Sequence, residues 1–443
     1  MKENAVNRFI DERKFGEFHI ILIITGLFLI AFTGYGSTAY GSITTSITEE
    51  WNLNDTVLGY MGSLSEFGSM FGAIILSVIS NRKGVKKVLI SSVLIFCVFT
   101  FGQSLAGNAA VFGLCRFLAG VGFGGVIPLV ISLLSEYAPK KNKSRAVAIA
   151  LSGNQVGSII ASLLAIVIIS RFGWRPVFWM AFVPILFLGF IIKFVPESTQ
   201  YLVEKGEPEQ IRKILKRIDE NYENELDVDK ALREYTETKT ETAKVSYFEL
   251  FSGRLFLVTI LAAVIYVMGL LFINGVIVWL PNVMVQNGFS LGSSLTFSII
   301  LNIGTIAGTA VWGVVADRKG FKVLLPTIYT VGAAALMLMG VKTNTLIMYL
   351  FVFMIGFFLF SAHSLVNAFV SQHYPEKLRT SAVGFVNSVG RLGGIFGPTL
   401  GGLLLSADAS IAVWFGVFGG TGLIAAVSFV IINIFTKYRS VNE

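Results

Sequence analysis

Long apolar runs separated by short polar turns dominate this chain. Twelve runs are long enough to cross about 30 Å of hydrocarbon, which takes roughly 20 helical residues. They cover residues 18–44, 56–80, 88–106, 110–135, 145–170, 176–195, 253–281, 292–316, 323–341, 346–372, 380–405 and 411–435. The pattern therefore predicts an all-α membrane protein with twelve transmembrane helices.

A charged turn recurs at the same place in the two parts of this pattern. Residues 77–87 read Ser-Val-Ile-Ser-Asn-Arg-Lys-Gly-Val-Lys-Lys, and residues 313–322 read Gly-Val-Val-Ala-Asp-Arg-Lys-Gly-Phe-Lys. Each turn closes one apolar run and precedes the next. The repeat predicts two pseudo-symmetric six-helix bundles, an architecture typical of secondary transporters that rock around a central substrate.

One long polar segment separates these bundles. The predicted organisation is an N-terminal segment (1–17), a first bundle (18–195), a linker (196–252), a second bundle (253–435) and a tail (436–443). Within the linker, Pro208 can open a helix. Ile211, Ile214 and Leu215 share one face of it, with basic residues opposite, which predicts an amphipathic helix lying against the bundle or the lipid surface. Residues 224–244 are equally consistent with a solvated linker.

Composition supports a protein embedded in a bilayer. Of 443 residues, 54% are hydrophobic and 14% are charged, and the mean hydropathy is +0.72. The net charge of +8 is a topology signal and not a nucleic-acid footprint. Basic residues gather at both termini and after the second, fourth, eighth and tenth runs, whereas the alternate loops hold only Arg171, Arg175 and Lys342. Both termini are therefore predicted to lie in the cytoplasm.

The remaining compositional signals are simple. No cleavable signal peptide precedes the first run, which is too long for one. Cys97 and Cys115 both fall within helices, so neither a disulfide framework nor a metal site is predicted. No cofactor is expected. The expected partners are the lipid bilayer and a small molecule, with no nucleic acid.

The charged turns resemble the loop motif Gly-x-x-x-Asp-Arg-x-Gly-Arg-Arg of the major facilitator superfamily. The second copy matches better, because Ser77 and Asn81 replace the Gly and Asp in the first. Residues 116–124, 172–175 and 196–202 are similar to further motifs of that superfamily. Residues 279–281 and 389–393 resemble most the aromatic acid/proton symporters, with niacin-permease-like and organic-ion transporters as neighbours. The resemblance implies a monomeric, multi-pass transporter in the plasma membrane, expected to be a bacterial inner membrane.

The first helix departs from that group's pattern. Aromatic acid symporters usually carry Asp-Gly-Tyr-Asp or a similar sequence there, whereas this chain reads Thr33-Gly34-Tyr35-Gly36. Two acids with a presumed role in binding or proton coupling are missing at Thr33 and Gly36. If protons are coupled to transport, another acid must carry them.

Charged residues deep inside apolar runs are candidate functional groups, because burying charge in hydrocarbon is costly. Arg391 lies close to the midplane of the eleventh run and can bind a carboxylate bidentately. The alternative is a structural salt bridge. Glu66 in the second run and Arg116 in the fourth could form a proton-coupled switch, or a static buried pair.

Other polar and aromatic groups at mid-depth complete the predicted substrate pocket. His363 could titrate near neutral pH, although a lone histidine is more often a packing residue. The remaining candidates are Tyr35, Tyr40, Asn154, Gln155, Tyr266, Asn274, Asn302 and Asn387. A few amides and phenols around one arginine suit a small, flat organic anion better than a sugar.

Charged loop residues are the candidate conformational gate. Asp317 can cap a helix and pair with Arg318 or with a base across the interface, holding the outward-facing state. Asn81 beside Arg82 carries no charge, so the latch of the first half is predicted to be the weaker one. Glu136 and Arg145 bracket the loop after the fourth run.

The leading hypothesis is a proton-coupled importer of a small organic anion, working by alternating access. Efflux of amphipathic compounds is an alternative, although residues 152–157 lack the proline that exporters usually carry there. A sugar-like porter and a non-transporting membrane sensor are further alternatives. The sequence shows no metal-ligand cluster, nucleophile–base pair or phosphate-binding glycine loop, so an enzyme is not expected.

Overall fold

A computed structural model describes residues 5–220, 222–224, 226–238, 247–253, 255–341, 343–375 and 378–437. Three basic residues of the topology argument, Lys342, Lys377 and Arg439, lie outside the described residues. So do parts of the predicted segments 1–17, 196–252 and 436–443.

The first half of the molecule contains six membrane-length segments. These are α2 (Glu17–Trp51), α3 (Asp55–Lys83), α4 (Val85–Ser104), α5 (Ala109–Tyr137), α6 (Lys143–Phe172) and a broken sixth segment made of η1 (Arg175–Ala181), α7 (Phe182–Leu186) and α8 (Leu188–Phe194). The sixth segment contains Pro184 in its interior, where proline cannot donate a backbone hydrogen bond and interrupts the helix.

The second half repeats this arrangement. Its segments are α12 (Leu255–Gln286), α13 (Leu291–Lys319), α14 (Phe321–Leu338), a composite fourth segment, α18 (Arg379–Ser406) and α19 (Ile411–Lys437). The composite segment consists of α15 (Thr345–Met354), the π-helical η5 (Ile355–Phe360), α16 (Ser361–Ser364) and α17 (Val366–Gln372). In the described part of the chain, eleven segments are long and apolar enough to cross a membrane. The twelfth, α18, is not one of these eleven, but it packs against α12 and α3.

Short polar caps set many of these boundaries. The side chain of Asn54 accepts a hydrogen bond from the Val57 N–H at the start of α3, and Asn108 does the same for α5. Gly84 and Gly320 end α3 and α13 with φ of +94° and +75°, which favours glycine. The charged turns recognised in the sequence therefore coincide with sharp helix ends.

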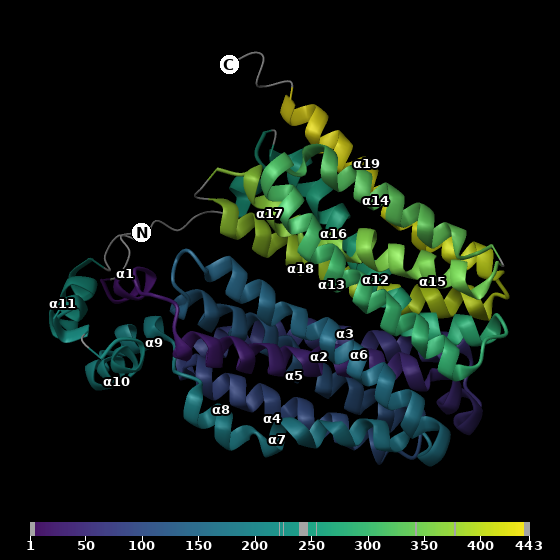
Figure 1. The fold of residues 1–443 in the computed structure, drawn as a ribbon, viewed down its shortest axis with the longest axis horizontal. Helices are drawn as coiled ribbons and strands as arrows, with labels where there is room; N and C mark the ends of the chain where they lie inside the picture. The colour runs from purple at the N-terminus through teal and green to yellow at the C-terminus, as the bar shows by residue number, and fades with distance from the viewer. Residues whose placement is uncertain are drawn as a thin grey trace.

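Short helices cluster at one end of the bundle, which we call the linker end. They are α1 (Ala5–Asp11), α9 (Thr199–Lys205), α10 (Pro208–Ile218), η2 (Tyr222–Asn224) and α11 (Val228–Thr238), while η4 (Tyr247–Phe251) leads into α12. The two halves diverge toward the linker end and converge toward the opposite end, the far end (Figure 1). Between the halves, α3 packs on α18, α2 on α12 and α6 on α13.

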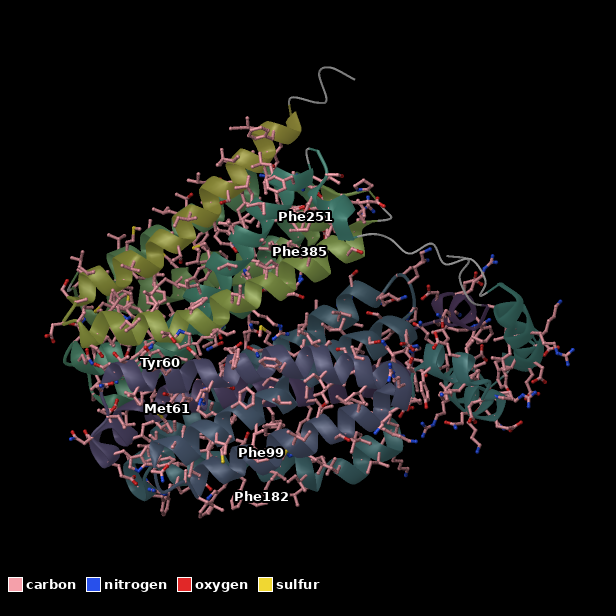
Figure 2. All side chains as sticks on the ribbon, turned by 180° about the vertical axis from the view of Figure 1, so that it is seen from behind. Tyr60, Met61, Phe99, Phe182, Phe251 and Phe385 are labelled. Atoms are coloured by element: carbon pink, nitrogen blue, oxygen red, sulfur yellow. The ribbon has the colours of Figure 1, made fainter. Side chains whose placement is uncertain are left out.

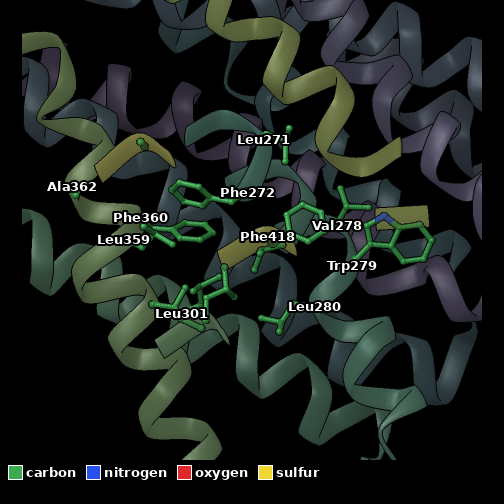
Figure 3. Close-up of a cluster of buried hydrophobic side chains, with 14 of the residues drawn as sticks. Leu271, Phe272, Val278, Trp279, Leu280, Leu301, Leu359, Phe360, Ala362 and Phe418 are labelled. Carbon is green, nitrogen blue, oxygen red and sulfur yellow. The ribbon is translucent and has the colours of Figure 1, made fainter. Parts of the chain in front are cut away.

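Two apolar cores hold the molecule together. One joins the first half to α1 and the linker helices, so the apolar face of α10 lies against protein: Ile211 and Leu215 are fully buried. The other spans the second half and the far end of the first. In the second half it includes Phe272 from α12 and Phe360 from η5, with ring centroids 5.7 Å apart (Figure 3).

Candidate functional site

Arg391 lies at the interface between the two halves. It is the thirteenth residue of α18, roughly 18 Å along the helix from its first residue. Its Nη1 donates a hydrogen bond to Ser69 Oγ on α3 at 3.0 Å. A guanidinium has five N–H donors. In the part of the chain that the structure describes, this is the one hydrogen bond that Arg391 makes, so most of its donors are available to a ligand.

Glu66 lies beside Arg391, one helical turn from Ser69. A Cβ added to Gly394 would lie 3.3 Å from Glu66 Oε2 and 3.1 Å from Asn274 Nδ2, so these two polar groups converge on the same point of α18. Glu66 interacts electrostatically with Arg391 and with Arg116. Neither arginine comes within 4.0 Å of it, and among the described residues Glu66 forms no ion pair.

A polar cluster in the second half extends from Arg391. The Tyr266 phenol interacts with the amides of Asn367 and Asn387 and electrostatically with Arg391. Asn387 Nδ2 donates to Asn367 Oδ1 at 2.8 Å. The edge of the His363 ring meets Tyr266 with centroids 4.7 Å apart. These side chains come from α12, α16, α17 and α18, so four elements build one cluster.

His363 is held firmly within this cluster. Its Nδ1 lies 3.3 Å from the Tyr329 hydroxyl, and its ring occupies the space that a side chain at Gly269 would need. Glycine at position 269 therefore makes room for the imidazole. The arrangement gives His363 a fixed orientation beside Tyr266.

Arg116 has a different environment, inside the first half. It is 3% exposed, and its Nε donates to the Met61 carbonyl at 2.8 Å. Its guanidinium carbon lies 3.8 Å from the centroid of the Tyr40 ring, a cation–π contact. The Tyr40 hydroxyl donates to the Leu58 carbonyl at 2.6 Å. Met61 lies near the place where the halves converge (Figure 2).

Three more predicted residues are engaged within their own half. The Tyr35 hydroxyl donates to the Val177 carbonyl at 2.6 Å, Asn154 Nδ2 donates to Thr33 Oγ1 at 3.0 Å, and Asn302 Nδ2 donates to the Ser298 carbonyl at 2.8 Å. Gln155, one residue beyond Asn154 on α6, is half-buried. Among the described residues, no hydrogen bond or ring contact joins Tyr35, Tyr40 or Asn302 to Arg391.

Phe123 packs against Gly36, the position in the first transmembrane helix where aromatic acid symporters usually carry the second acid. Its ring occupies the space that a Cβ at Gly36 would need. A Cβ at Gly34 would meet the backbone carbonyl of Asn154 even more closely, so α2 and α6 approach each other at backbone distance. The first half therefore has no room for an aspartate at position 36 without displacement of Phe123.

The predicted gate residues lie at the linker end. Asn81, Arg82, Arg145, Asp317 and Arg318 are exposed. In the described part of the chain, no hydrogen bond or ion pair joins any of these side chains to the other half.

Glu136 instead binds the segment that enters the linker. Its carboxylate accepts hydrogen bonds from Ser198 Oγ at 2.9 Å and from the Thr199 N–H at 2.8 Å. The neighbouring Tyr137 hydroxyl donates to the Glu197 carbonyl. Glu197 Oε1 in turn accepts from the Lys86 N–H at 3.0 Å. The linker entrance is thus fixed to the first half.

Hydroxyl groups close the far end between α3 and α18. Thr56 Oγ1 and Ser406 Oγ are 2.8 Å apart, and Ser63 Oγ lies 2.8 Å from Thr399 Oγ1. With Ser69 and Arg391, these contacts form an antiparallel series, which we call the outer seam. Ser69 was not predicted from the sequence, although Ser63, Glu66 and Ser69 recur every three residues and therefore share one face of a helix.

A pocket of about 500 Å³ lies at the far end, beyond the outer seam. Glu49, Asp55 and Asp408 contribute its acidic lining. None of the predicted substrate-binding residues line it, and three carboxylates disfavour an anion there. The chemistry suited to an anion is therefore around Arg391 and not in this pocket.

Comparisons with known proteins show the family to which the chain belongs. Residues 26–398 and 304–442, two overlapping stretches, match the Major Facilitator Superfamily. The chain is 32% identical over 413 residues to a benzoate transport protein of Acinetobacter baylyi, covering 91% of this chain and 87% of that protein. It is 30% identical over 427 residues to a gentisate transporter of Corynebacterium glutamicum, covering 95% of this chain and 89% of that protein.

The fold is similar to that of a solved transporter. The xylose transporter XylE from E. coli, in a partially occluded inward open conformation, aligns with a TM-score of 0.74 at 18% identity, covering 93% of this chain and 98% of XylE. The predictions of twelve helices in two halves and of a transporter rather than an enzyme are confirmed. This chain belongs to the Major Facilitator Superfamily.

Proposed function

We propose that this protein imports a small aromatic carboxylate by alternating access, with Arg391 as the residue that binds the carboxylate. The observation that carries the proposal is a half-buried guanidinium at the interface of the two halves, with a single hydrogen bond to the described part of the protein. A carboxylate can accept two parallel hydrogen bonds from the remaining N–H groups of Arg391. Such bidentate pairs are strong where water is scarce.

The surroundings of Arg391 favour an aromatic ring on that carboxylate. Tyr266 and His363 contribute two rings from the same half as Arg391. Asn274 and Asn387 supply amides that can bind hydroxyl groups on the substrate ring. Relatives named for benzoate and gentisate support this substrate class. Asn154, Gln155 and Asn302 are further proposed substrate contacts of lesser weight. Tyr35 and Tyr40 support the site through packing.

Glu66 is the proposed proton carrier. It is close enough to Arg391 to interact with it electrostatically, yet it forms no ion pair among the described residues. A carboxylate substrate bound to Arg391 would bring a second negative charge near Glu66, which favours its protonation. Proton and substrate then bind together, which is the requirement for symport. Arg116 would act on Glu66 only through the electrostatic field of its positive charge.

The exposed charged turns at one end and the closed outer seam at the other together support an orientation of the protein in the membrane. We assign the linker end to the cytoplasm, with both termini there, because Lys and Arg concentrate at that end. The bacterial inner membrane and a monomer are part of the same proposal. In the conformation that is closed at the linker end, Asp317 and Arg318 would contact the first half. Asn81, Arg82, Glu136 and Arg145 would form the weaker gate of the first half. The two bundles, 18–195 and 253–435, are the proposed moving units.

Uptake by reconstituted proteoliposomes tests this function. We expect wild-type protein to accumulate radiolabelled benzoate when the outside is acidic, and Arg391→Ala to lose this activity. Arg171→Ala, which removes an exposed arginine, is the matched control and should transport normally. Glu66→Gln should abolish accumulation driven by a pH gradient but retain exchange of benzoate across the membrane. Equal uptake by wild type and Arg391→Ala would contradict the proposal.

A further inference from the structure

Three basic residues from separate elements lie near one another at the linker end of the first half. Lys86 lies at the start of α4, Lys193 near the end of α8 and Arg217 in the last turn of α10. Arg217 Nη2 donates a hydrogen bond to the backbone carbonyl of Lys193 at 3.1 Å, and the charges of Lys86 and Arg217 repel each other. Lys86 and Arg217 thus bring like charges together, with Lys193 beside Arg217, and an anion would stabilise this arrangement. We call these residues the basic cluster.

Among the acids near the basic cluster, Glu197 attracts the charge of Lys86, and Glu197, Asp219 and Asp229 all hold other groups as well. Glu197 faces Lys86, but its Oε1 accepts hydrogen bonds from the backbone N–H groups of Lys86 and Ser198 at 3.0 and 2.9 Å. Asp219 and Asp229 pair with other arginines, at 2.9 and 2.5 Å. Across the described ranges of the chain, no carboxylate comes within 4.0 Å of the charged nitrogens of the basic cluster.

The basic cluster lies at the border of the lipid-facing surface. In the sixth segment, Phe187, Phe190 and Ile192 are between 44% and 50% exposed, as expected of side chains that contact lipid tails. Lys193 follows them directly, and its Nζ lies 5.4 Å from the centroid of the Phe194 ring. An exposed lysine beside an apolar surface is typical of the headgroup level of a bilayer.

We propose that the basic cluster binds the phosphate of an anionic phospholipid in the leaflet at the linker end. The charges are complementary, and the exposed apolar surface next to them accommodates the acyl chains, which a free phosphate would not use. Arg217 can bind phosphate oxygens bidentately, and Lys86 and Lys193 add point charges. One lipid would then join α10 to α4 and α8. The linker helix is thereby tied both to the first half and to the membrane.

Thermal unfolding of the purified full-length protein in detergent, titrated with lipid, tests this site. The probes are phosphatidylglycerol, phosphatidylcholine and inorganic phosphate. We expect phosphatidylglycerol alone to raise the melting temperature of the wild type. The double variant Lys193→Gln/Arg217→Gln should need at least about fivefold more phosphatidylglycerol for the same shift, because each basic residue near an anionic surface contributes to binding.

Two control variants separate this site from general charge effects. Lys140→Gln/Lys141→Gln removes two exposed lysines from the loop between α5 and α6 and should respond like the wild type. Lys193→Arg/Arg217→Lys keeps the charge and should retain lipid stabilisation. Equal responses of the two glutamine variants would overturn the proposal. So would an equal shift with inorganic phosphate or with phosphatidylcholine. The readout is lipid binding, so it is independent of the proposed transport activity.

Discussion

Each half of this transporter holds an arginine deep within the membrane, and the two have very different surroundings. In the first half, Arg116 is 3% exposed, hydrogen-bonded to backbone carbonyls of α3 and packed on the Tyr40 ring. In the second half, Arg391 is half-buried and, among the described residues, makes one hydrogen bond, to Ser69 across the interface. Arg116 is thus held within its own half by two hydrogen bonds and an aromatic ring, whereas Arg391 has one protein partner in the described part of the chain.

This difference assigns separate tasks to the halves. The first half is closely packed around its polar groups, with Phe123 against Gly36 and the Tyr35 hydroxyl on the Val177 carbonyl. The second half instead gathers Tyr266, His363 and its amides beside an arginine at the interface. We infer that the second half supplies most of substrate recognition, and that the first half supplies Glu66 and a rigid surface.

The largest expected effect comes from placing an acid in the closely packed first half. Gly36→Asp inserts a carboxylate where the Phe123 ring lies, and we expect it to cost at least about 3 kcal/mol of folding free energy. Thermal unfolding of the purified variant measures this loss. The double variant Gly36→Asp/Phe123→Ala should recover part of it. Wild-type stability of the single variant would show that the first half is not closed there.

Removal of the buried arginine should also act on stability. Arg116→Gln leaves the Met61 and Gly62 carbonyls without their donor and removes the contact with Tyr40, which we expect to cost about 2 kcal/mol. The benzoate affinity of the folded fraction should stay within about twofold of wild type. A large loss of affinity without loss of stability would place Arg116 in the substrate site and end the contrast between the two arginines.

A matched pair of tyrosines tests the same contrast more finely. Tyr266→Phe should weaken benzoate binding about fivefold, which corresponds to the loss of one hydrogen bond of about 1 kcal/mol. The melting temperature should change little. Tyr35→Phe should do the reverse, because its hydroxyl satisfies the buried Val177 carbonyl. Calorimetric titration and thermal unfolding of both variants give the two readouts. Weaker binding in Tyr35→Phe alone would reverse the assignment.

The smallest expected effect concerns the contact between the halves. Ser69→Ala removes the hydroxyl that accepts from Arg391, which weakens the outer seam and favours opening at the far end. A cysteine reporter at Leu53, with Cys97 and Cys115 replaced by alanine, should react about threefold faster with a thiol reagent in this variant. Ser91→Ala, an exposed serine on α4, is the control. An unchanged rate would remove Ser69 from the seam.

Helix positions could be predicted because apolar runs of the required length have few alternatives in a membrane. The first helix nevertheless ends at Trp51, seven residues later than predicted. Its last turns are rich in threonine, and the Thr44 and Thr48 hydroxyls bond to carbonyls of the preceding turn, at 3.0 and 2.8 Å. Hydropathy alone does not register such internal satisfaction of polar side chains.

Arg391 and Glu66 could be found from the sequence because lone charges in apolar runs are conspicuous. The directions of Tyr35 and Tyr40 could not, because a helix that is apolar all round carries no signal for which face meets which neighbour. Tyr329 was missed for the same reason, although it lies 3.3 Å from His363. The role of Phe123 against Gly36 depends on how closely two helices approach, which only the packed structure determines.

The central claim is that Arg391 binds a carboxylate, and calorimetric titration of benzoate into purified protein tests it most directly. The wild type should bind benzoate but not the neutral analogue benzamide. Arg391→Gln should bind benzoate at least about tenfold more weakly, while Arg391→Lys should retain part of the affinity because it keeps the charge but not the bidentate geometry. If Arg391→Gln binds benzoate as tightly as the wild type, Arg391 does not hold the carboxylate and the account is wrong.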